Sequence, residues 1–316
     1  MFTHTCPFDP TYGYSLSTLQ SISAPPPPGD FEMFWRDTYE QTLAVPLDLV
    51  TRRIQIPELK NRGEAFEVEY QSFGPHRTTA WLTVPNIRPL ARGVVWSHGY
   101  GERGGPDLDW YGPPAVQIFP CARGLGRSNW PGGPRDVPAH VTHGIASRET
   151  YIHRLNITEL WSAASVLLHL FPDIAGHLDY AGGSFGGGIG AMVIPWEKRF
   201  RRAYIDMPSF GHHPIRLECT CQGSGEAVRL HYQRHPEIAE TLRYYDSATH
   251  SLFTTTPTLV APALFDPAVP PPGQFAVANA LACEKKVFIR QAAHFDWPGA
   301  TAEHENLCRE LNAWFS

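Results

Sequence analysis

The sequence predicts an α/β fold in which a mostly parallel central sheet is flanked by helices. Short apolar runs typical of buried strands alternate along the chain with longer stretches of helical periodicity. The chain has 316 residues and a hydrophobic content of 42%, which is enough for one large core. A glycine-rich turn at residues 182–186 separates an apolar run from a helix-compatible stretch. We therefore expect a single domain over residues 1–316.

The composition argues against several classes of protein. The net charge is -5, which gives no electrostatic reason to bind nucleic acid. No apolar run reaches the roughly 20 residues that a membrane-spanning helix needs. The first residues carry neither the basic nor the apolar region of a signal peptide. We expect a cytoplasmic protein with no membrane or nucleic-acid partner.

The six cysteines are expected to be reduced thiols, because the chain is long and shows no export signal. Cys219 and Cys221 follow His212 and His213 closely, which suggests a metal-ligand set. The single residue between the two cysteines is fewer than the two to four that zinc sites usually have. We expect neither a metal nor a cofactor.

Residues 1–45 are expected to form an N-terminal arm and helix. The four consecutive prolines at residues 25–28 predict a stiff, extended segment. Asp30 can cap the helix that follows, in which apolar and aromatic residues recur at helical spacing. The members of this stripe are Phe31, Phe34, Trp35, Thr38, Tyr39, Thr42 and Leu43. We expect the stripe to pack against the main body rather than to bind a ligand.

Strands and helices alternate in the rest of the chain. Strands are expected at residues 66–70, 78–84, 93–96, 116–121, 178–181, 203–205, 258–264 and 286–290. Helices are expected at residues 147–171, 185–196, 275–283 and 301–315. Between residues 208 and 256 the sequence predicts no strand but helices at 227–234 and 237–245. We expect this stretch to form a lid-like insertion above the sheet.

The turn at residues 182–186 reads GGSFG, which is the Gly-x-Ser-x-Gly pattern of a nucleophile elbow between a strand and a helix. In such a turn Ser184 stands exposed above the sheet, and glycine neighbours leave room for its strained backbone. The N-terminal end of the following helix points its positive dipole at the same place. From this motif alone, a glycine-rich turn that merely contains a serine remains an alternative.

Two more residues with catalytic chemistry follow expected strands. Asp266 comes after the strand at 258–264, and His294 comes after the strand at 286–290. A serine hydroxyl becomes a nucleophile when an imidazole takes its proton, and a carboxylate orients that imidazole. The order serine, acid, histidine is that of the α/β-hydrolases. Asp206, which follows the strand at 203–205, is an alternative acid.

These motifs resemble the acetyl xylan esterase/cephalosporin C deacetylase family of α/β-hydrolases over nearly the whole chain. The similar segments are GY at 99–100, RGLG at 123–126, THGI at 142–145, GGSFGG at 182–187 and DMP at 206–208. The resemblance implies an α/β-hydrolase fold with Ser184 as nucleophile, Asp266 as acid and His294 as base. It also implies an oxyanion hole made by the backbone N–H groups of Tyr100 and Phe185, and a homo-oligomer.

The chain departs from the family pattern at three polar positions. Leu125 and Phe185 stand where the family has Gln, and Phe295 stands where it usually has Glu. We expect Arg123, Leu125 and Phe295 to line the substrate pocket. The apolar replacements then predict an acetate ester that is bulkier and more apolar than an acetylated sugar.

The sequence therefore predicts a serine esterase that acts on a small-molecule ester. The enzyme would remove a small acyl group, foremost acetyl, through an acyl-serine intermediate. The alternative is an acetate-eliminating lyase or an acyltransferase that uses the same residues to tailor an acetylated natural product.

Overall fold

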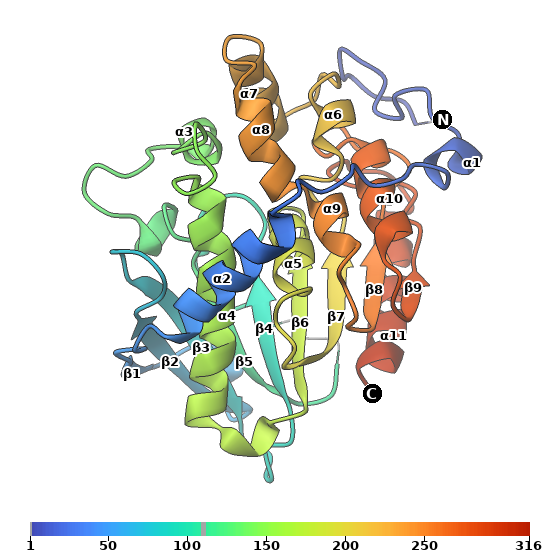
Figure 1. Ribbon diagram of the computed structural model, residues 1–316. Coiled ribbons are helices and arrows are strands. Elements are labelled where there is room, and N and C mark those ends of the chain that lie inside the picture. The colour runs from blue at the N-terminus through green and yellow to red at the C-terminus, as the bar shows by residue number, and fades with distance from the viewer. Residues whose placement is uncertain (1, 109–111) are drawn as a thin grey trace.

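A twisted sheet forms the centre of the protein (Figure 1). The computed structural model describes residues 2–108 and 112–316, and Met1 of the expected arm lies outside them. In this part of the chain the sheet has nine strands in the order β1-β2-β3-β5-β4-β6-β7-β8-β9. The strands are β1 (Val50–Ile54), β2 (Gly63–Tyr70), β3 (Thr78–Pro85), β4 (Gly93–Ser97), β5 (Val116–Pro120), β6 (Leu178–Gly183), β7 (Phe200–Asp206), β8 (Thr258–Ala261) and β9 (Lys285–Val287).

The sheet is antiparallel at one end and parallel over the rest. The pairings β1–β2, β2–β3 and β3–β5 are antiparallel. Every pairing from β5 through β4 to β9 is parallel. The carboxyl ends of the parallel strands therefore meet at one edge. In an α/β sheet this is the edge where ligands bind and chemistry occurs.

Helices cover both faces of the sheet. Helices α2 (Phe31–Leu43), α4 (Ile152–Leu170), α5 (Phe185–Val193) and α10 (Pro271–Ala280) share one large core with inward residues such as Val95 and Tyr180. Helix α11 (Ala300–Phe315) packs on the opposite face, in a second core that contains Val94 and Ala181. Neighbouring residues of one strand thus enter different cores, as the alternation of side chains along a strand requires. Figure 1 shows α2, α4 and α5 in front of the sheet and α11 behind it.

Some expected boundaries differ from the observed ones. The long helix begins at Ile152 rather than at residue 147, because residues 147–150 form a turn in which Thr150 binds the carbonyl oxygen of Gly144. Helix α5 ends at Val193, β8 ends at Ala261, and β9 spans only Lys285–Val287. The first strand, β1, was not expected. Most of its residues are exposed on both faces of the sheet edge. Its sequence, VTRRI, therefore shows no alternation of apolar and polar residues, which is the pattern that indicates a strand.

Four α-helices, one short 3-10 helix (Arg243–Tyr245) and no strand occupy the chain between β7 and β8. The α-helices are α6 (His213–Arg216), α7 (Ser224–Tyr232), α8 (Ile238–Leu242) and α9 (Ser247–Ser251). Figure 1 shows α6, α7 and α8 above the carboxyl ends of the parallel strands, and α9 beside α5 and α10. Two further short helices are α1 (Leu16–Leu19) in the N-terminal arm and α3 (Val137–Val141) between β5 and α4. None of the helices in the described residues is both long and apolar enough to cross a membrane.

Asp246 ties the helices of this insertion together. Its side chain is 1% exposed and accepts backbone N–H groups at the start of α6 and at the start of α9. The donors are His212, His213, Ala248 and Thr249. One carboxylate therefore satisfies the free N–H groups of two helix ends that are far apart in the sequence.

Asp246→Ala is expected to lower the free energy of unfolding by about 3 kcal/mol, since it leaves buried N–H groups without acceptors. Urea unfolding of the two proteins measures this difference. Asp136→Ala is the matched control, because the exposed Asp136 caps α3 through a single N–H group. It should cost about 1 kcal/mol. Equal losses in the two variants would contradict the role given to Asp246.

Candidate active site

Ser184 lies at the turn between β6 and α5, in a backbone conformation that residues other than glycine rarely adopt. Its φ is 55° and its ψ is -114°. Glycine neighbours make the turn possible: a Cβ at position 186 would lie 2.8 Å from the carbonyl oxygen of His98. The first turn of α5 can therefore approach the end of β4 closely. Strained backbone of this kind persists where the surrounding fold holds it, and it is common at catalytic residues.

Three side chains from distant parts of the chain form one hydrogen-bonded line. His294 Nε2 lies 2.9 Å from Ser184 Oγ. On the other side of the ring, His294 Nδ1 lies 2.9 Å and 3.0 Å from the two carboxylate oxygens of Asp266. A carboxylate accepts hydrogen bonds only, so Nδ1 carries the proton and donates to Asp266. Nε2 is then free to accept the proton of the Ser184 hydroxyl.

Asp266 is held rigidly for this task. Its side chain is completely buried, and Oδ1 accepts the backbone N–H groups of Ala268 and Val269 at 2.8 Å and 2.9 Å. Oδ2 accepts the side-chain amide of Gln274 at 2.8 Å. Because these donors fix the plane of the carboxylate, the carboxylate in turn fixes the ring of His294. Gln274 gave no signal in the sequence that pointed to this role.

The environment of His294 favours its protonated form. Burial disfavours the cation, but the hydrogen bond to Asp266 and the charge of Asp266 outweigh it, so the pKa of His294 lies above its ordinary value of 6.5. A general base has to be neutral before it can take a proton. Activity that depends on His294 should therefore decline as the pH falls through a value above 6.5.

The alternative acid, Asp206, pairs with Arg290 rather than with His294. Arg290 Nη1 donates to both of its carboxylate oxygens at 3.0 Å and 2.8 Å. Its backbone carbonyl accepts the N–H group of Ser184 at 2.9 Å. The structure thus brings Asp266, and not Asp206, into hydrogen bonding with His294.

The two residues expected to provide the oxyanion donors contact each other through their rings. Phe185 is the first residue of α5, and the first N–H groups of a helix have no partner within the helix. Tyr100 belongs to the loop after β4, and its ring lies 4.4 Å from that of Phe185, measured between centroids. The start of this loop lies beside the start of α5, since a Cβ at Gly186 would meet the carbonyl oxygen of His98.

Two neutral histidines hold the Tyr100 loop to the turn after β5. Burial, together with the charge of Arg103, lowers the pKa of His98 to about 4, and burial lowers that of His140 to about 4. His98 donates from Nδ1 to the carbonyl oxygen of Gly99 at 2.6 Å and accepts the N–H group of Ala122 at 3.0 Å. His140 Nδ1 accepts the Tyr100 hydroxyl at 3.0 Å.

His140 completes the link by donating from Nε2 to the carbonyl oxygen of Arg123 at 3.0 Å. Sequence reasoning assigned no role to His98 or His140. Each histidine therefore spans from the oxyanion loop to the turn at residues 122–123, which fixes the position of the loop.

The structure places the three expected pocket residues away from the cavity at Ser184. Arg123 is completely buried, where its Nε donates to Glu159 at 3.1 Å and its Nη2 donates to Thr158 at 2.7 Å. Leu125 is 7% exposed and belongs to the large core. Phe295 packs against other aromatic rings rather than facing this cavity.

The rings around Phe295 come partly from the N-terminal arm. Phe2 lies 5.1 Å, 5.7 Å and 5.3 Å from the rings of Phe265, Phe295 and Trp297. Further along the arm, the carbonyl oxygen of Pro10 accepts the backbone N–H group of Asp266 at 3.1 Å. The apolar residue after His294 thus packs against the N-terminal arm, beside the line formed by Ser184, His294 and Asp266.

The ring of Phe185 is also explained by packing. It is 1% exposed and lies among the rings of His98, Tyr100, His140, His153 and Phe210. The replacement of Gln by Phe therefore completes an aromatic cluster under the oxyanion loop, and it leaves the backbone N–H group in place.

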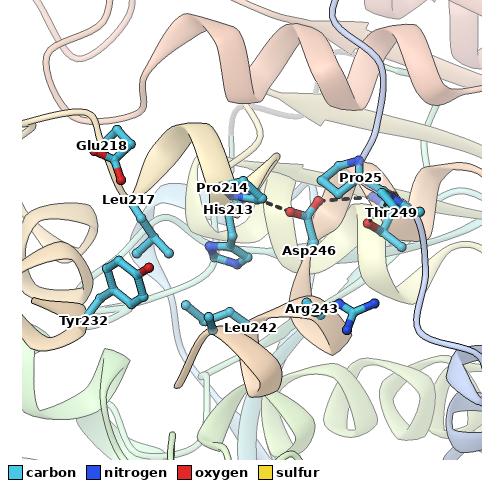
Figure 2. Close-up of a pocket in the computed structure, with 12 residues that line it drawn as sticks. Pro25, His213, Pro214, Leu217, Glu218, Tyr232, Leu242, Arg243, Asp246 and Thr249 are labelled. Atoms are coloured by element: carbon cyan, nitrogen blue, oxygen red, sulfur yellow. Dashed lines mark hydrogen bonds between the residues drawn. The ribbon is translucent and has the colours of Figure 1, made fainter. Parts of the chain in front are cut away.

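Two cavities near the carboxyl ends of the parallel strands are lined by different elements. The first, of about 560 Å³, is lined by Ser184, Tyr100 and His98 together with His304 and Leu307 of α11. The second, of about 400 Å³, lies within the insertion, and Figure 2 shows His213, Leu217, Tyr232 and Leu242 around it. No residue of the hydrogen-bonded line faces the second cavity.

The cysteines and histidines of the insertion do not assemble into a metal centre in the described part of the chain. No group of three or more His, Cys, Asp or Glu side chains there could hold a metal ion. Cys219 and Cys221 are free thiols, and burial raises the pKa of each to about 11. His213 instead donates to the carbonyl oxygen of Tyr245 at 3.1 Å.

A family model described as acetyl xylan esterase (AXE1) matches residues 14–306. The chain belongs to the acetyl xylan esterase family. The resemblance expected from the motifs is confirmed, and so is the α/β-hydrolase fold. Members of this family are carboxylic ester hydrolases.

Solved structures show the same fold over nearly the whole chain. The acetyl xylan esterase from Paenibacillus sp. R4 is 23% identical, with a TM-score of 0.81 over 94% of this chain and 99% of that one. Acetyl xylan esterase 1 from Thermoanaerobacterium sp. JW/SL YS485 is 18% identical, with a TM-score of 0.82 over 96% and 99%. The acylaminoacyl peptidase of Pyrococcus horikoshii is more distant: 13% identity and a TM-score of 0.61 over 82% of this chain and 42% of that one.

Asp266→Asn is expected to lower kcat by about 10⁴-fold, because an amide no longer holds the required tautomer of His294. The low-pH limb of the residual activity should shift to a lower pH than in the wild type. The reason is that the variant lacks the carboxylate charge that raises the pKa of His294. A pH profile of kcat/KM measures both effects. Asp296→Asn, two residues from His294 and exposed, is the matched control. An unshifted limb in the Asp266 variant would contradict the pairing.

Proposed function

We propose that the protein is a serine esterase that removes acetyl groups from a small-molecule ester. The observation that carries the proposal is the line Ser184–His294–Asp266, with hydrogen bonds of 2.9 Å at both ring nitrogens of the histidine. Membership of the acetyl xylan esterase family supports an acetyl ester as substrate.

The reaction begins with a proton transfer. His294 Nε2 takes the proton of the Ser184 hydroxyl while Oγ attacks the carbonyl carbon of the ester. The carbonyl oxygen becomes an oxyanion, which the backbone N–H groups of Tyr100 and Phe185 stabilise. Each such donor is worth about 3 kcal/mol in the transition state. Asp266 stabilises the imidazolium that forms.

The tetrahedral intermediate then collapses to an acyl-enzyme. The bond to the alcohol oxygen breaks, and His294 gives its proton to that oxygen, so the alcohol leaves and acetyl-Ser184 remains. A water molecule repeats the sequence: His294 removes its proton, its oxygen attacks the acetyl carbon, and Ser184 recovers its proton as acetate departs. The positioned histidine therefore serves as base and acid in turn.

Two features of the site support the proposed position of the oxyanion. The hydroxyl of Tyr100 is occupied by His140, so the loop that carries the Tyr100 N–H group is anchored at its side chain. The dipole of α5, whose first residue follows the nucleophile, adds a positive field at the same point. Both features are formed before a substrate arrives, which is what preorganised stabilisation requires.

Ser184→Ala is expected to lower kcat for acetate esters by about 10⁴- to 10⁶-fold. A fluorophosphonate probe should label the wild-type protein at one site and should not label this variant. Hydrolysis of 4-nitrophenyl acetate and intact-mass measurement provide the readouts. Ser21→Ala, at an exposed serine of the N-terminal arm, is the control and should behave as wild type. Undiminished hydrolysis by the Ser184 variant would overturn the proposal.

A further inference from the structure

Arg216, the last residue of α6, is a buried cation without a counter-charge. Its side chain is 4% exposed. The nitrogens Nε and Nη1 are buried and have no hydrogen-bond partner, and within the described residues the guanidinium forms no ion pair.

Two other arginines of the fold are neutralised by carboxylates. Arg123, which is completely buried, lies 3.1 Å from Glu159, and Arg290 lies 2.8 Å from Asp206. Burying an unpaired charge is costly, because the protein does not replace the water that solvated it. The ring of Phe210, 5.0 Å from the Arg216 guanidinium carbon, offsets only part of this cost. The remaining donors are available to an anion from outside the chain.

The position of Arg216 relates it to the catalytic line. The ring of Phe210 lies 6.0 Å from that of Phe185, so the guanidinium is one aromatic layer from the residue after the nucleophile. Burial raises the pKa of the Tyr100 hydroxyl, and the charge of Arg216 acts on it in the opposite direction. The same holds for Tyr12.

Tyr12 marks the other side of the site. Its hydroxyl donates to the carbonyl oxygen of Thr220 at 2.9 Å. The backbone N–H group of Gln222 donates to the carbonyl oxygen of Pro267, the residue after Asp266, at 2.8 Å. The segment that follows Arg216 is therefore joined to the loop that carries Asp266.

The insertion makes room for the charge. Gly225, in the first turn of α7, faces the guanidinium: a Cβ there would lie 2.8 Å from Arg216 Nη2 and 2.7 Å from the sulfur of Cys221. Any larger residue would press on both groups. The absence of a side chain at Gly225 thus leaves space for the guanidinium of Arg216, which has no carboxylate partner in the described residues.

We propose that Arg216 binds a carboxylate of the substrate, so that the preferred ester carries a negative charge. A guanidinium presents its N–H groups in a fork that matches the two oxygens of a carboxylate. This inference rests on the proposed esterase function. The carboxylate belongs either to the acyl part, as in a dicarboxylic monoester, or to the alcohol part, as in an acetylated hydroxy acid.

Two pairs of esters test the inference and distinguish these sources. For the acyl part, 4-nitrophenyl hydrogen succinate is compared with 4-nitrophenyl methyl succinate. For the alcohol part, 3-acetoxybenzoate is compared with its methyl ester. The wild type is expected to favour the charged member of one pair by about tenfold or more in kcat/KM, as a charge-assisted hydrogen bond allows. The pair that shows the preference identifies the part that carries the charge.

Arg216→Met keeps the length of the side chain and removes the charge. It should abolish the preference for the charged ester, measured as the ratio of kcat/KM for the two members of the pair. Arg216→Lys should retain part of the preference, since it keeps the charge without the fork. The matched control is Arg234→Met, which removes one charge from an exposed position of the insertion and should keep the full preference.

A binding measurement makes the test independent of the variants' folding. Benzoate and succinate monomethyl ester should raise the Tm of the wild type, and the uncharged benzamide should not. If neither charged ester is favoured and neither carboxylate raises the Tm, the inference is overturned. Hydrolysis of 4-nitrophenyl acetate and labelling of Ser184 would then still support the esterase. Loss of both of these activities would overturn the proposed function instead.

Discussion

The hydrogen bond between Asp266 and His294 is the interaction on which the rest of the site depends. It fixes which ring nitrogen carries the proton, and it raises the pKa of the imidazole. Without it, the nitrogen that faces Ser184 would not be held as an acceptor. The surroundings of Asp266 serve this one bond, since two backbone N–H groups and the amide of Gln274 fix the carboxylate from the other side.

A second constraint is the approach of α5 to the end of β4. The glycine at position 186 lets the two backbones come together, and the aromatic ring of Phe185 then packs under the Tyr100 loop. His98 and His140 attach that loop to the following turn. One packed cluster thus positions Ser184 and the two residues that we propose as oxyanion donors.

The sequence predicted the residues whose local context is distinctive. Ser184 lies in a strand–turn–helix pattern, while Asp266 and His294 each follow a recognisable strand, so topology alone brings them to one edge. His98 and His140 could not be found in this way, because their partners Ala122 and Tyr100 are 24 and 40 residues away and no periodic pattern connects them. The packing of Phe2 on Phe295 joins opposite ends of the chain, and only the folded structure relates the two.

We propose that Ser184 carries the acyl group during the reaction. The most direct test is to quench the reaction with an acetate ester within the first turnovers, digest the protein and locate the added mass. We expect one acetyl group, confined to the peptide that contains Ser184 and absent when no substrate is added. Turnover without any acetylated peptide, or with acetyl on a different residue, would contradict it.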